Sequence, residues 1–525
     1  MRPTFMGLET ARRGMFTQQS ALYITGHNIS NANTPGFSRQ RVNFQPTIPY
    51  PGNGINRPYM PGQMGTGVEA GSIQRIRDSF IDARYRSESN QLGYYGARSD
   101  ALTRMEDVMN EPTSEGLSAA MDNFWNSLQT LGTNPNVSGA RESVLAQGNA
   151  MADTFNYLST TLNSIRNDLK QSISVNVDKI NTLAYQINEI NKQIGQVEPH
   201  GDLPNDLYDE RDRLVDELSQ LVNIKVTNQQ SGGMPSPIAE GTYKIEILDH
   251  SGKSMGTLVD KNTIGGEPNK ISYKMNNDGY VESLSIGNGS PVKVEDFSKG
   301  ALRSDIEAYG YVDKSGKQVG TYPDMVDQLD KLAFALVKEY NAIHRTGFDL
   351  NGNDNKDFFQ DLSDYKGAAS KISVAISDPN EIAASLIDTN GKGNGDNAYK
   401  LADVLRKDLS EFVAVIKDPI TGNDIDLKDY TQTNLKMTGN IKSFYGGLIT
   451  SLGVKTREAN TLTNNTLTLL DSVDRQRQSV SGVSLDEEMS NLIRFQHAYN
   501  ASARNITVLD EMLDKIINGM GTVGR

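Results

Sequence analysis

The sequence contains no cysteine, which excludes disulfides, thiolate metal sites and cysteine nucleophiles. It has no apolar run of about 18 residues, so we expect no segment that spans a bilayer. Its first residues have neither an apolar core nor a small-residue cleavage site, so we expect no cleaved secretory signal. The single tryptophan, Trp125, is expected to pack in a core rather than bind a ligand. These absences indicate a protein that is cytoplasmic or exported by a route that uses no cleaved signal.

The chain is acidic and only moderately apolar. Its 525 residues carry a formal net charge of -13, and the pI is about 5.1. Broad binding to nucleic acid or to an anionic membrane is therefore not expected. Hydrophobic residues make up 37% of the chain and the mean hydropathy is -0.51. These values are low for a compact enzyme and typical of long helices that bury one stripe. The length predicts roughly three or four domains.

The stretch from residue 485 to residue 520 carries apolar side chains at alternating steps of four and three. Charged and amide residues fill its other faces, so the pattern predicts an amphipathic helix. Because a lone helix with a narrow apolar stripe is marginally stable in water, this helix requires a partner. Gln496 and Ala503 weaken the stripe, which suits a helix that stays loose until assembly. The predicted assembly interface of this helix is Leu485, Met489, Leu492, Tyr499, Ile506 and Leu513.

An N-terminal helix over residues 5–31 is the candidate partner, because it carries a heptad-like stripe of its own. Paired N- and C-terminal helices would form a coiled-coil-like bundle and bring both ends of the chain together. The residues predicted to form the assembly interface of the N-terminal helix are Leu8, Met15, Leu22 and Ile29.

A polar segment follows this helix and is expected to end it, because asparagine is a poor helix former. Pro35 fixes φ at position i+1 of a turn, and Gly36 supplies the positive φ that a type II turn requires at i+2. The chain should therefore leave the helix at a fixed angle, and an ordinary loop is the competing interpretation. We define the signature turn as Asn28, Asn31, Asn33, Thr34, Pro35, Gly36 and Phe37.

Between its ends the chain alternates extended and helical patterns. Residues 38–72 are expected to be extended, and short alternating runs predict a small antiparallel β domain over 224–300. The longest helical pattern covers 138–197 and would form a rod roughly 90 Å long. Further elements are expected as helices at 73–109, 114–131, 205–222, 324–344, 398–412 and 434–478 and as a strand at 372–376.

The predicted fold is mainly α with an inserted β domain, and the molecule is expected to be elongated and multidomain. The chain would run outward through helices, form a β domain and return through helices. The result would be a rod with the two ends of the chain together at one end. The predicted segments are an N-terminal helix of an inner terminal domain (1–45), the first part of a helical rod domain (46–223), an outer antiparallel β domain (224–300), a helical rod segment (301–348), a mixed α/β outer segment (349–433), a returning rod helix (434–480) and the C-terminal helix of the inner terminal domain (481–525).

No catalytic, cofactor-binding or metal site is predicted, because no nucleophile elbow, zinc helix or dinucleotide fingerprint occurs. Segment 349–357 resembles a calcium loop, but its sixth residue, Asp354, is not Gly and its twelfth, Gln360, is not Glu. A solvated turn is favoured there, and a bound ion is the alternative. The acidic groups at 209–210 and 486–488 are expected to be solvated faces or helix N-terminal charges rather than an acid–base pair.

Three stretches together resemble the flagellar hook-associated protein 1 family. Residues 15–40, which end in the signature turn, are similar to the signature of flagellar rod, hook and hook-associated proteins. Residues 205–214 (NDLYDERDRL) are similar to a motif of this particular family, and residues 484–499 continue the likeness at the C-terminus. Residues 226–300 and 365–430 depart from the family's pattern.

The resemblance implies an axial flagellar protein that acts as a structural adaptor between hook and filament. It implies export in an unfolded state by the flagellar type III apparatus, which reads no cleaved signal. The implied partners are further copies in a helical ring, the hook protein, hook-associated protein 3 and a cytoplasmic export chaperone that holds the C-terminal segment. An exposed apolar stripe agrees with a need for such cover before secretion.

Three alternatives stay open at this stage. The chain could be another axial protein of the hook or rod type, although the 205–214 motif argues against it. It could be a type III-secreted coiled-coil effector or adhesin whose β domain is the binding module. It could also carry an enzyme in residues 349–430, for which the sequence offers no catalytic motif.

Overall fold

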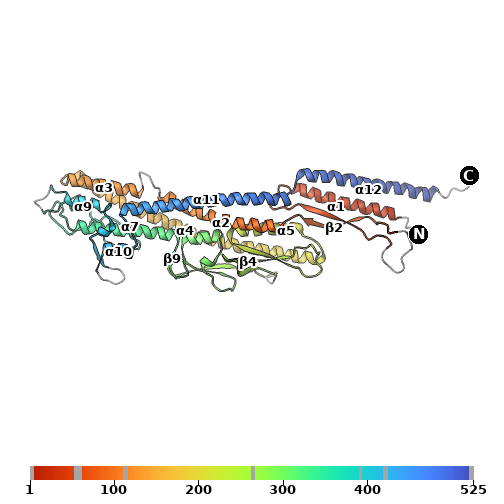
Figure 1. Ribbon diagram of the computed structural model, residues 1–525, viewed down its shortest axis with the longest axis horizontal. Helices are drawn as coiled ribbons and strands as arrows, with labels where there is room; N and C mark the ends of the chain where they lie inside the picture. Colours follow the sequence, from red (N-terminus) through yellow and green to blue (C-terminus); the bar gives the residue numbers. More distant parts are fainter. Residues whose placement is uncertain are drawn as a thin grey trace.

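The computed structural model describes residues 5–51, 62–109, 116–261, 266–388, 393–417 and 424–519. The molecule is elongated, and its first and last helices lie side by side at one end (Figure 1). These helices are α1 (Met6–Ser30) and α12 (Leu485–Gly519), and they run antiparallel. The predicted pairing of the two ends is therefore confirmed. Met520, the last residue of the predicted stripe, lies outside the described residues.

A β-hairpin packs along α1 at the same end of the molecule. Its strands are β1 (Gln40–Pro46) and β2 (Val68–Arg75), which pair antiparallel. The prediction that a helix begins at residue 73 is wrong, because Ile73 pairs with Val42 in the hairpin and α2 begins at Ser79. Apolar residues at the end of a strand and the start of the next helix happen to fall at helical spacing. We call α1, β1, β2 and α12 the terminal bundle.

Long helices form the rod. The 60-residue helix α4 has the bounds expected from its apolar period, and α11 packs along α2 (Figure 1). A capping box at Asn440 and Ser443 sets the start of α11. Helix α6 was not expected as a separate element. The helices of the rod are α2 (Ser79–Met109), α3 (Leu117–Thr133), α4 (Ser138–Val197), α5 (Asn205–Leu221), α6 (Ala301–Tyr309), α7 (Thr321–His344) and α11 (Ile441–Ser481).

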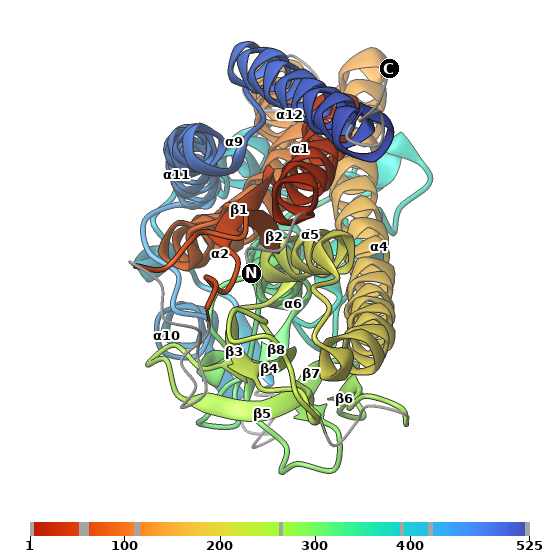
Figure 2. The ribbon, with the colours of Figure 1, turned by 90° about the vertical axis from the view of Figure 1, so that its right-hand side faces the viewer.

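Two small sheets lie on one side of the rod helices (Figure 2). Their strand orders are β3-β4-β5 and β6-β7-β8-β9, and all neighbours are antiparallel except β7 and β8, which are parallel. The strands expected within 224–300 are present as β3 to β7, but the second sheet continues beyond residue 300 through β8 and β9. The strands are β3 (Ile224–Gln229), β4 (Thr242–Leu248), β5 (Ser254–Val259), β6 (Ile271–Met275), β7 (Val281–Ile286), β8 (Tyr311–Val312) and β9 (Gln318–Val319).

The segment between α7 and α11 is mixed, as expected, but its strand prediction is wrong. Residues 372–376 form no strand, and Val374 makes only an isolated bridge to Phe359. Short helices and a small hairpin account for the regular structure here. These elements are α8 (Ala368–Lys371), α9 (Asp396–Asp403), β10 (Val415–Lys417), β11 (Asp424–Asp426) and α10 (Leu427–Thr433).

The apolar core is divided into two. One cluster runs through the rod and the sheets, and a second, small cluster holds the terminal bundle together. The second cluster consists of Ala21, Ile24 and Val42, with Ile73 and Phe495 packed against it. Among the described helices, none has an apolar stretch long enough to cross a bilayer. Because the two apolar clusters are separate, polar groups make the buried contacts that join the bundle to the rod.

Candidate functional site: the joint between the terminal bundle and the rod

Helices α1 and α12 meet along a seam of small residues. Gly7, Gly14, Ala21 and Asn28 recur every seven residues on α1. A Cβ added at Gly14 would lie 3.1 Å from Ser502 Oγ, so the helices approach closely there. The heptad spacing is repeated on α12 in the opposite direction. From the outer end to the joint, the facing pairs are Gly7–Leu509, Gly14–Ser502 and Asn28–Glu488, and Phe495, which packs against the cluster that contains Ala21, continues the spacing.

The residues predicted to form assembly interfaces lie beside this seam. Leu485 and Met489 are 52% and 50% exposed, so they extend away from α1. The others are half-buried, and their role in assembly stays a prediction. The half-buried residues are Leu8, Met15, Leu22 and Ile29 on α1 and Leu492, Tyr499, Ile506 and Leu513 on α12.

The signature turn has the predicted type II geometry. Gly36 has a φ of +84°, and the Phe37 amide donates to the Thr34 carbonyl oxygen at 3.2 Å. Asn31 begins the turn, where its side-chain oxygen accepts from the Thr34 hydroxyl at 3.2 Å. A Cβ added at Gly36 would lie 3.4 Å from the Arg213 side chain of α5. The turn therefore packs against helix α5 of the rod.

The signature turn also contributes residues that face back into the bundle. The Phe37 ring meets the His27 ring edge-on, with the centroids 5.4 Å apart. Asn33 and Pro35 are exposed at the tip of the turn. The buried Asn28 pairs with the backbone of Gln40, because its Oδ1 accepts from the Gln40 amide at 3.0 Å and its Nδ2 donates to the Gln40 carbonyl at 2.8 Å. This pairing fixes where β1 begins relative to the end of α1.

A buried carboxylate of α12 joins this pairing. Glu488 Oε2 accepts from Asn28 Nδ2 at 3.2 Å, and its Oε1 accepts from Arg39 Nε at 2.7 Å. The Arg39 guanidinium also reaches the exposed Glu487 at 2.6 Å. Of the two interpretations of residues 486–488, the helix N-terminal charge holds at Glu488, which lies in the first turn of α12, and the solvated face does not, because Glu488 is 2% exposed. A carboxylate in the first turn of a helix also interacts favourably with the helix dipole.

Helix α5 of the rod receives the other side of the turn. Gln40 Nε2 donates to Asp206 Oδ1 at 2.8 Å, and the Ser38 amide donates to Asp209 Oδ2 at 3.0 Å. Asn205 Nδ2 donates to the Ile73 carbonyl of β2 at 2.9 Å. Asp209 is buried rather than solvated, so the expectation for residues 209–210 is wrong at this position. The 205–214 motif thus belongs to the joint.

Behind the turn lies a buried network of ions. Arg75 at the end of β2 contacts Asp209 at 2.6 Å, Asp212 at 3.0 Å and Glu240 at 2.6 Å. Burial alone would lower the pKa of Arg75, but these carboxylates outweigh it and raise that pKa well above its ordinary value. The network joins five guanidinium groups and six carboxylates. Its members are Arg75, Arg77, Arg86, Arg211 and Arg477 with Asp82, Asp209, Asp212, Asp216, Asp474 and Glu240.

Asp212 is the centre of this network. Arg75 and Arg77 contact one of its carboxylate oxygens and Arg86 the other, and the Tyr243 hydroxyl donates to it at 2.9 Å. Burial would raise the pKa of Asp212, but the surrounding guanidinium groups outweigh this effect and hold the pKa well below its usual range. Because each ion of the network has a partner of opposite charge, the network can fix the elements that it joins.

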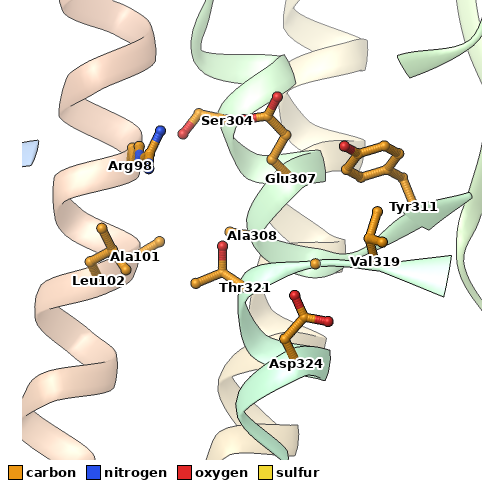
Figure 3. A pocket seen from close by; sticks show the side chains of 11 residues that line it. Arg98, Ala101, Leu102, Ser304, Glu307, Ala308, Tyr311, Val319, Thr321 and Asp324 are labelled. Carbon is orange, nitrogen blue, oxygen red and sulfur yellow. The ribbon is translucent and has the colours of Figure 1, made fainter. Parts of the chain in front are cut away.

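A small cavity lies elsewhere in the rod. It measures about 230 Å³ and lies between α2, α6 and the segment leading into α7 (Figure 3). Glu307 in its wall is held by Tyr94 and Arg303, each at 2.7 Å. Burial raises the pKa of Asp324 on the opposite side. Within the described ranges, no three His, Asp or Glu side chains are grouped to hold a metal ion.

The segment that resembles a calcium loop is closed by its own hydrogen bonds. Asp349 Oδ1 accepts from the amides of Asn351 at 2.7 Å and Asn353 at 2.8 Å. Its Oδ2 accepts from Asn353 Nδ2 at 3.0 Å. These bonds make an Asx turn, which favours the interpretation as a turn over that as an ion site.

Family models match three parts of this chain. Residues 102–359 match "Flagellar hook-associated protein FlgK helical domain", which covers most of the rod and the two sheets. Residues 8–37 match "Flagella basal body rod protein", and residues 475–519 match "Flagellar basal body rod FlgEFG protein C-terminal". The last two models cover the signature turn and α12, which meet at the joint.

Whole-chain comparisons agree with these matches. The chain is 44% identical to "Flagellar hook-associated protein 1" of Bacillus subtilis (strain 168), covering 100% of both chains. It is 26% identical to the protein of the same name from Escherichia coli (strain K12), covering 97% of this chain and 99% of the relative. The fold resembles the flagellar hook junction protein FlgK from Burkholderia pseudomallei with a TM-score of 0.57 at 13% identity, covering 76% of this chain and 100% of that one. The chain therefore belongs to the flagellar hook-associated protein 1 family.

Proposed function

We propose that this protein is a structural adaptor of the bacterial flagellum that assembles at the distal end of the hook and forms the hook–filament junction. One observation carries the proposal. Both ends of the chain pair in a bundle at one end of a helical rod, in a chain 44% identical over its full length to a hook-associated protein 1. This architecture gathers the assembly surfaces at one end and leaves the sheets at the side. Its work is mechanical, and it needs no catalytic group.

Assembly proceeds through the terminal helices. Several large apolar side chains of α12 stay exposed beside its seam with α1, and exposed apolar groups of this kind mark interaction surfaces. Copies of this chain in a helical ring would cover them. These side chains, each about half exposed, are Leu485, Met489, Ile493, Val508, Met512 and Ile516.

The proposed partners follow from the position at a junction. They are neighbouring copies in the ring, the hook protein on one side and hook-associated protein 3 on the other. Before assembly the exposed apolar side chains of α12 require cover, which a cytoplasmic export chaperone would provide. The protein would then be exported through the flagellar type III apparatus and reside outside the cell, in the flagellum. No nucleic acid, membrane insertion or cofactor is part of this proposal.

Deletion of residues 485–525 tests the assembly role of α12. We expect the truncated protein to be exported but absent from the junction, so that cells lack filaments. Met512→Lys is the matching point variant, because Met512 is a large apolar residue of α12 that is 57% exposed. Asn505→Lys, at an exposed polar position of the same helix, is its control. Filaments on cells with the truncated protein would overturn the role of α12.

Electron microscopy of flagella labelled with an antibody to the full chain tests the location. Label confined to a band between hook and filament is the expected result. Label along the whole hook or in the rod would identify a hook- or rod-type protein instead. Label away from the flagellum would favour the secreted effector or adhesin. Since these patterns differ, the experiment separates the adaptor from the alternatives.

A further inference from the structure

Helix α11 returns along the outside of the rod, and its two halves are held differently. Figure 2 shows it at the edge of the rod, on the side opposite α4, and its main neighbour is α2. In its first half, Ile441, Tyr445, Leu452 and Ala459 belong to the apolar core of the rod. Among the described residues of α11, none after Ala459 belongs to either apolar cluster. We call residues 460–481, which run from that point to the end of the helix, the strap.

The part of α2 that the strap packs against also lies outside the apolar core. Among the described residues of α2, the first that belongs to the core is Ala101. Polar contacts hold the earlier part of α2 to α5 instead. Arg86 binds Asp216 at 2.7 Å, and the Asn90 side chain donates to the Ser219 carbonyl oxygen at 2.9 Å. This part of α2 therefore stays on α5 whether or not the strap covers it.

One side chain of the strap carries its polar contacts with the rest of the rod. Among the described side chains of residues 461–480, only Arg477 forms an ion pair or hydrogen bond with another element, and it binds Asp216 of α5 at 2.6 Å. Its guanidinium also lies over the ring of Tyr85 on α2, 3.8 Å from the centroid. The polar attachment of the strap to the rod thus depends on one guanidinium.

The strap has a low intrinsic tendency to stay helical. Seven of the eleven residues from Asn460 to Leu470 are asparagine or threonine, which are poor helix formers. The threonine hydroxyls of this stretch donate to carbonyl oxygens four residues earlier, a bond that slightly destabilises and bends helices. A helix of this length and composition is marginal in water, so it unfolds where packing does not hold it.

We propose that the strap opens and closes by local unfolding while the rest of the rod stays folded, and that Arg477 fastens it when it is closed. One end stays attached, because Ser99 of α2 donates to the Asn460 side chain. At the other end a single backbone hydrogen bond joins Ser481 to Arg39, so the terminal bundle contributes little to holding the strap closed. The open strap can extend, since an extended chain spans about twice the length of a helix per residue. As a compliant side of an adaptor between two different tubes, the strap rests on the proposed function.

Hydrogen–deuterium exchange of the purified full-length chain measures the opening directly. After correction for intrinsic exchange rates, we expect the amides of residues 462–480 to exchange about tenfold faster than those of residues 445–458 in the same helix. In Arg477→Ala the exchange of the strap should rise by about a further fivefold, with α2 and the first half of α11 unchanged. Fluorescence of the single tryptophan, Trp125, verifies that the rod is folded in each variant.

Arg475→Ala is the matched control. Arg475 is exposed, lies two positions from Arg477 on the same helix and binds only Asp471 of the strap itself. We expect its exchange to equal that of the parent. A second variant, Asn464→Ala with Thr468→Ala, raises the helix propensity at two exposed positions and should slow the exchange of the strap.

Three results would overturn the strap. They are equal protection of the two halves of α11, equal exchange in Arg477→Ala and Arg475→Ala, and no slowing in the double alanine variant. None of them bears on the adaptor, because the measurement uses no flagella. Rapid exchange of the strap in a protein whose antibody label lies away from the flagellum would refute the adaptor and leave the strap in place.

Discussion

Asn28 and Glu488 lie 460 positions apart in the chain, yet the side-chain amide of Asn28 donates to Glu488 Oε2 at 3.2 Å. Both residues are buried, at 1% and 2% exposure, where α1 ends and α12 begins. A shift of α12 along α1 would bury Glu488 without its partners, which costs far more than a slip between small apolar residues. The pair therefore acts like a polar position in a coiled coil and sets the register of the terminal helices.

Replacing Glu488 should destabilise the terminal bundle specifically. In Glu488→Ala, Asn28 and Arg39 lose their shared acceptor, and hydrogen bonds to charged groups contribute about 1.5–3 kcal/mol. We expect the free energy of opening of residues 6–30 and 485–518 to fall by that amount, measured by hydrogen–deuterium exchange of the full chain. Glu487→Ala is the control, since Glu487 is exposed and its ion pair contributes little. Equal effects of the two variants would contradict the role of Glu488.

The register of the seam can be trapped covalently. A Cβ added at Gly14 would lie 3.9 Å from Ser502 Cβ, a separation typical of disulfides. In the double variant Gly14→Cys and Ser502→Cys, we therefore expect an intramolecular disulfide to form on mild oxidation. Non-reducing electrophoresis and mass spectrometry detect it. No other thiol competes, because the parent chain has no cysteine.

Gly14→Cys with Asn500→Cys is the matched control, because Asn500 is exposed on α12 two positions from the seam contact. We expect it to remain reduced under the same conditions. A disulfide that links two copies of the seam variant would show that α12 pairs with a neighbouring chain instead. If the seam variant forms neither an intramolecular nor an intermolecular disulfide, the register is contradicted.

The helices of the rod were largely predictable from the local sequence pattern, and the contacts of the joint were not. The bounds of α4 follow from apolar residues at sustained helical spacing, because such spacing indicates that one face of a helix is buried along its length. Gln40 and Asp206 show why the joint differs. Their contact spans 166 positions, and neither residue carries a local sign of its partner. Charged groups are usually solvated, so the sequence offered a solvated face or a helix N-terminal charge at Glu488 and Asp209. It carried no sign that both are buried in ion pairs with distant segments.

The same limit explains the errors at element boundaries. Residues 73, 76 and 80 share helical spacing, so the local pattern predicts that Ile73 belongs to a helix. In the structure Ile73 belongs to β2, whose partner strand β1 lies about 30 positions earlier in the chain. The signature turn was predictable, because Pro35 and Gly36 determine its backbone locally. The surface against which the turn packs was not predictable, since Arg213 and Asp209 come from a helix much later in the chain.

Gly36→Val should strain the joint. At a φ of +84° a β-branched residue is unfavourable, and Arg213 already lies against the position that the new Cβ would take. We expect a loss of about 1–3 kcal/mol in the free energy of unfolding and reduced motility. Denaturant titration and a swarming assay measure the two effects. Gly65→Val is the control, because a Cβ at Gly65 meets open space. Unchanged stability and motility in Gly36→Val would contradict the assigned turn.

His344 should make the rod less stable in weak acid. The ring is buried, its Nδ1–H donates to the Lys356 carbonyl at 2.8 Å, and its Nε2 accepts from the Ala383 amide at 3.0 Å. A proton on Nε2 would break the second bond. Burial lowers the pKa of His344 below its ordinary value of 6.5, and the nearby Asp357 and Asp349 oppose this effect only in part.

The direction of the pH effect follows from where the proton binds. Below pH 6.5 the unfolded chain takes up a proton at His344 that the folded chain does not bind until the lower, folded pKa is reached. Stability from this residue is therefore complete at neutral pH and is lost as the pH falls through that interval. Urea unfolding followed by Trp125 fluorescence at about pH 7.5 and about pH 5 measures it. We expect the parent to lose more stability between these values than His344→Gln, and His497→Gln on the exposed side of α12 to behave as the parent does. A loss of the same size in His344→Gln and in the parent would mean that His344 does not titrate in this range.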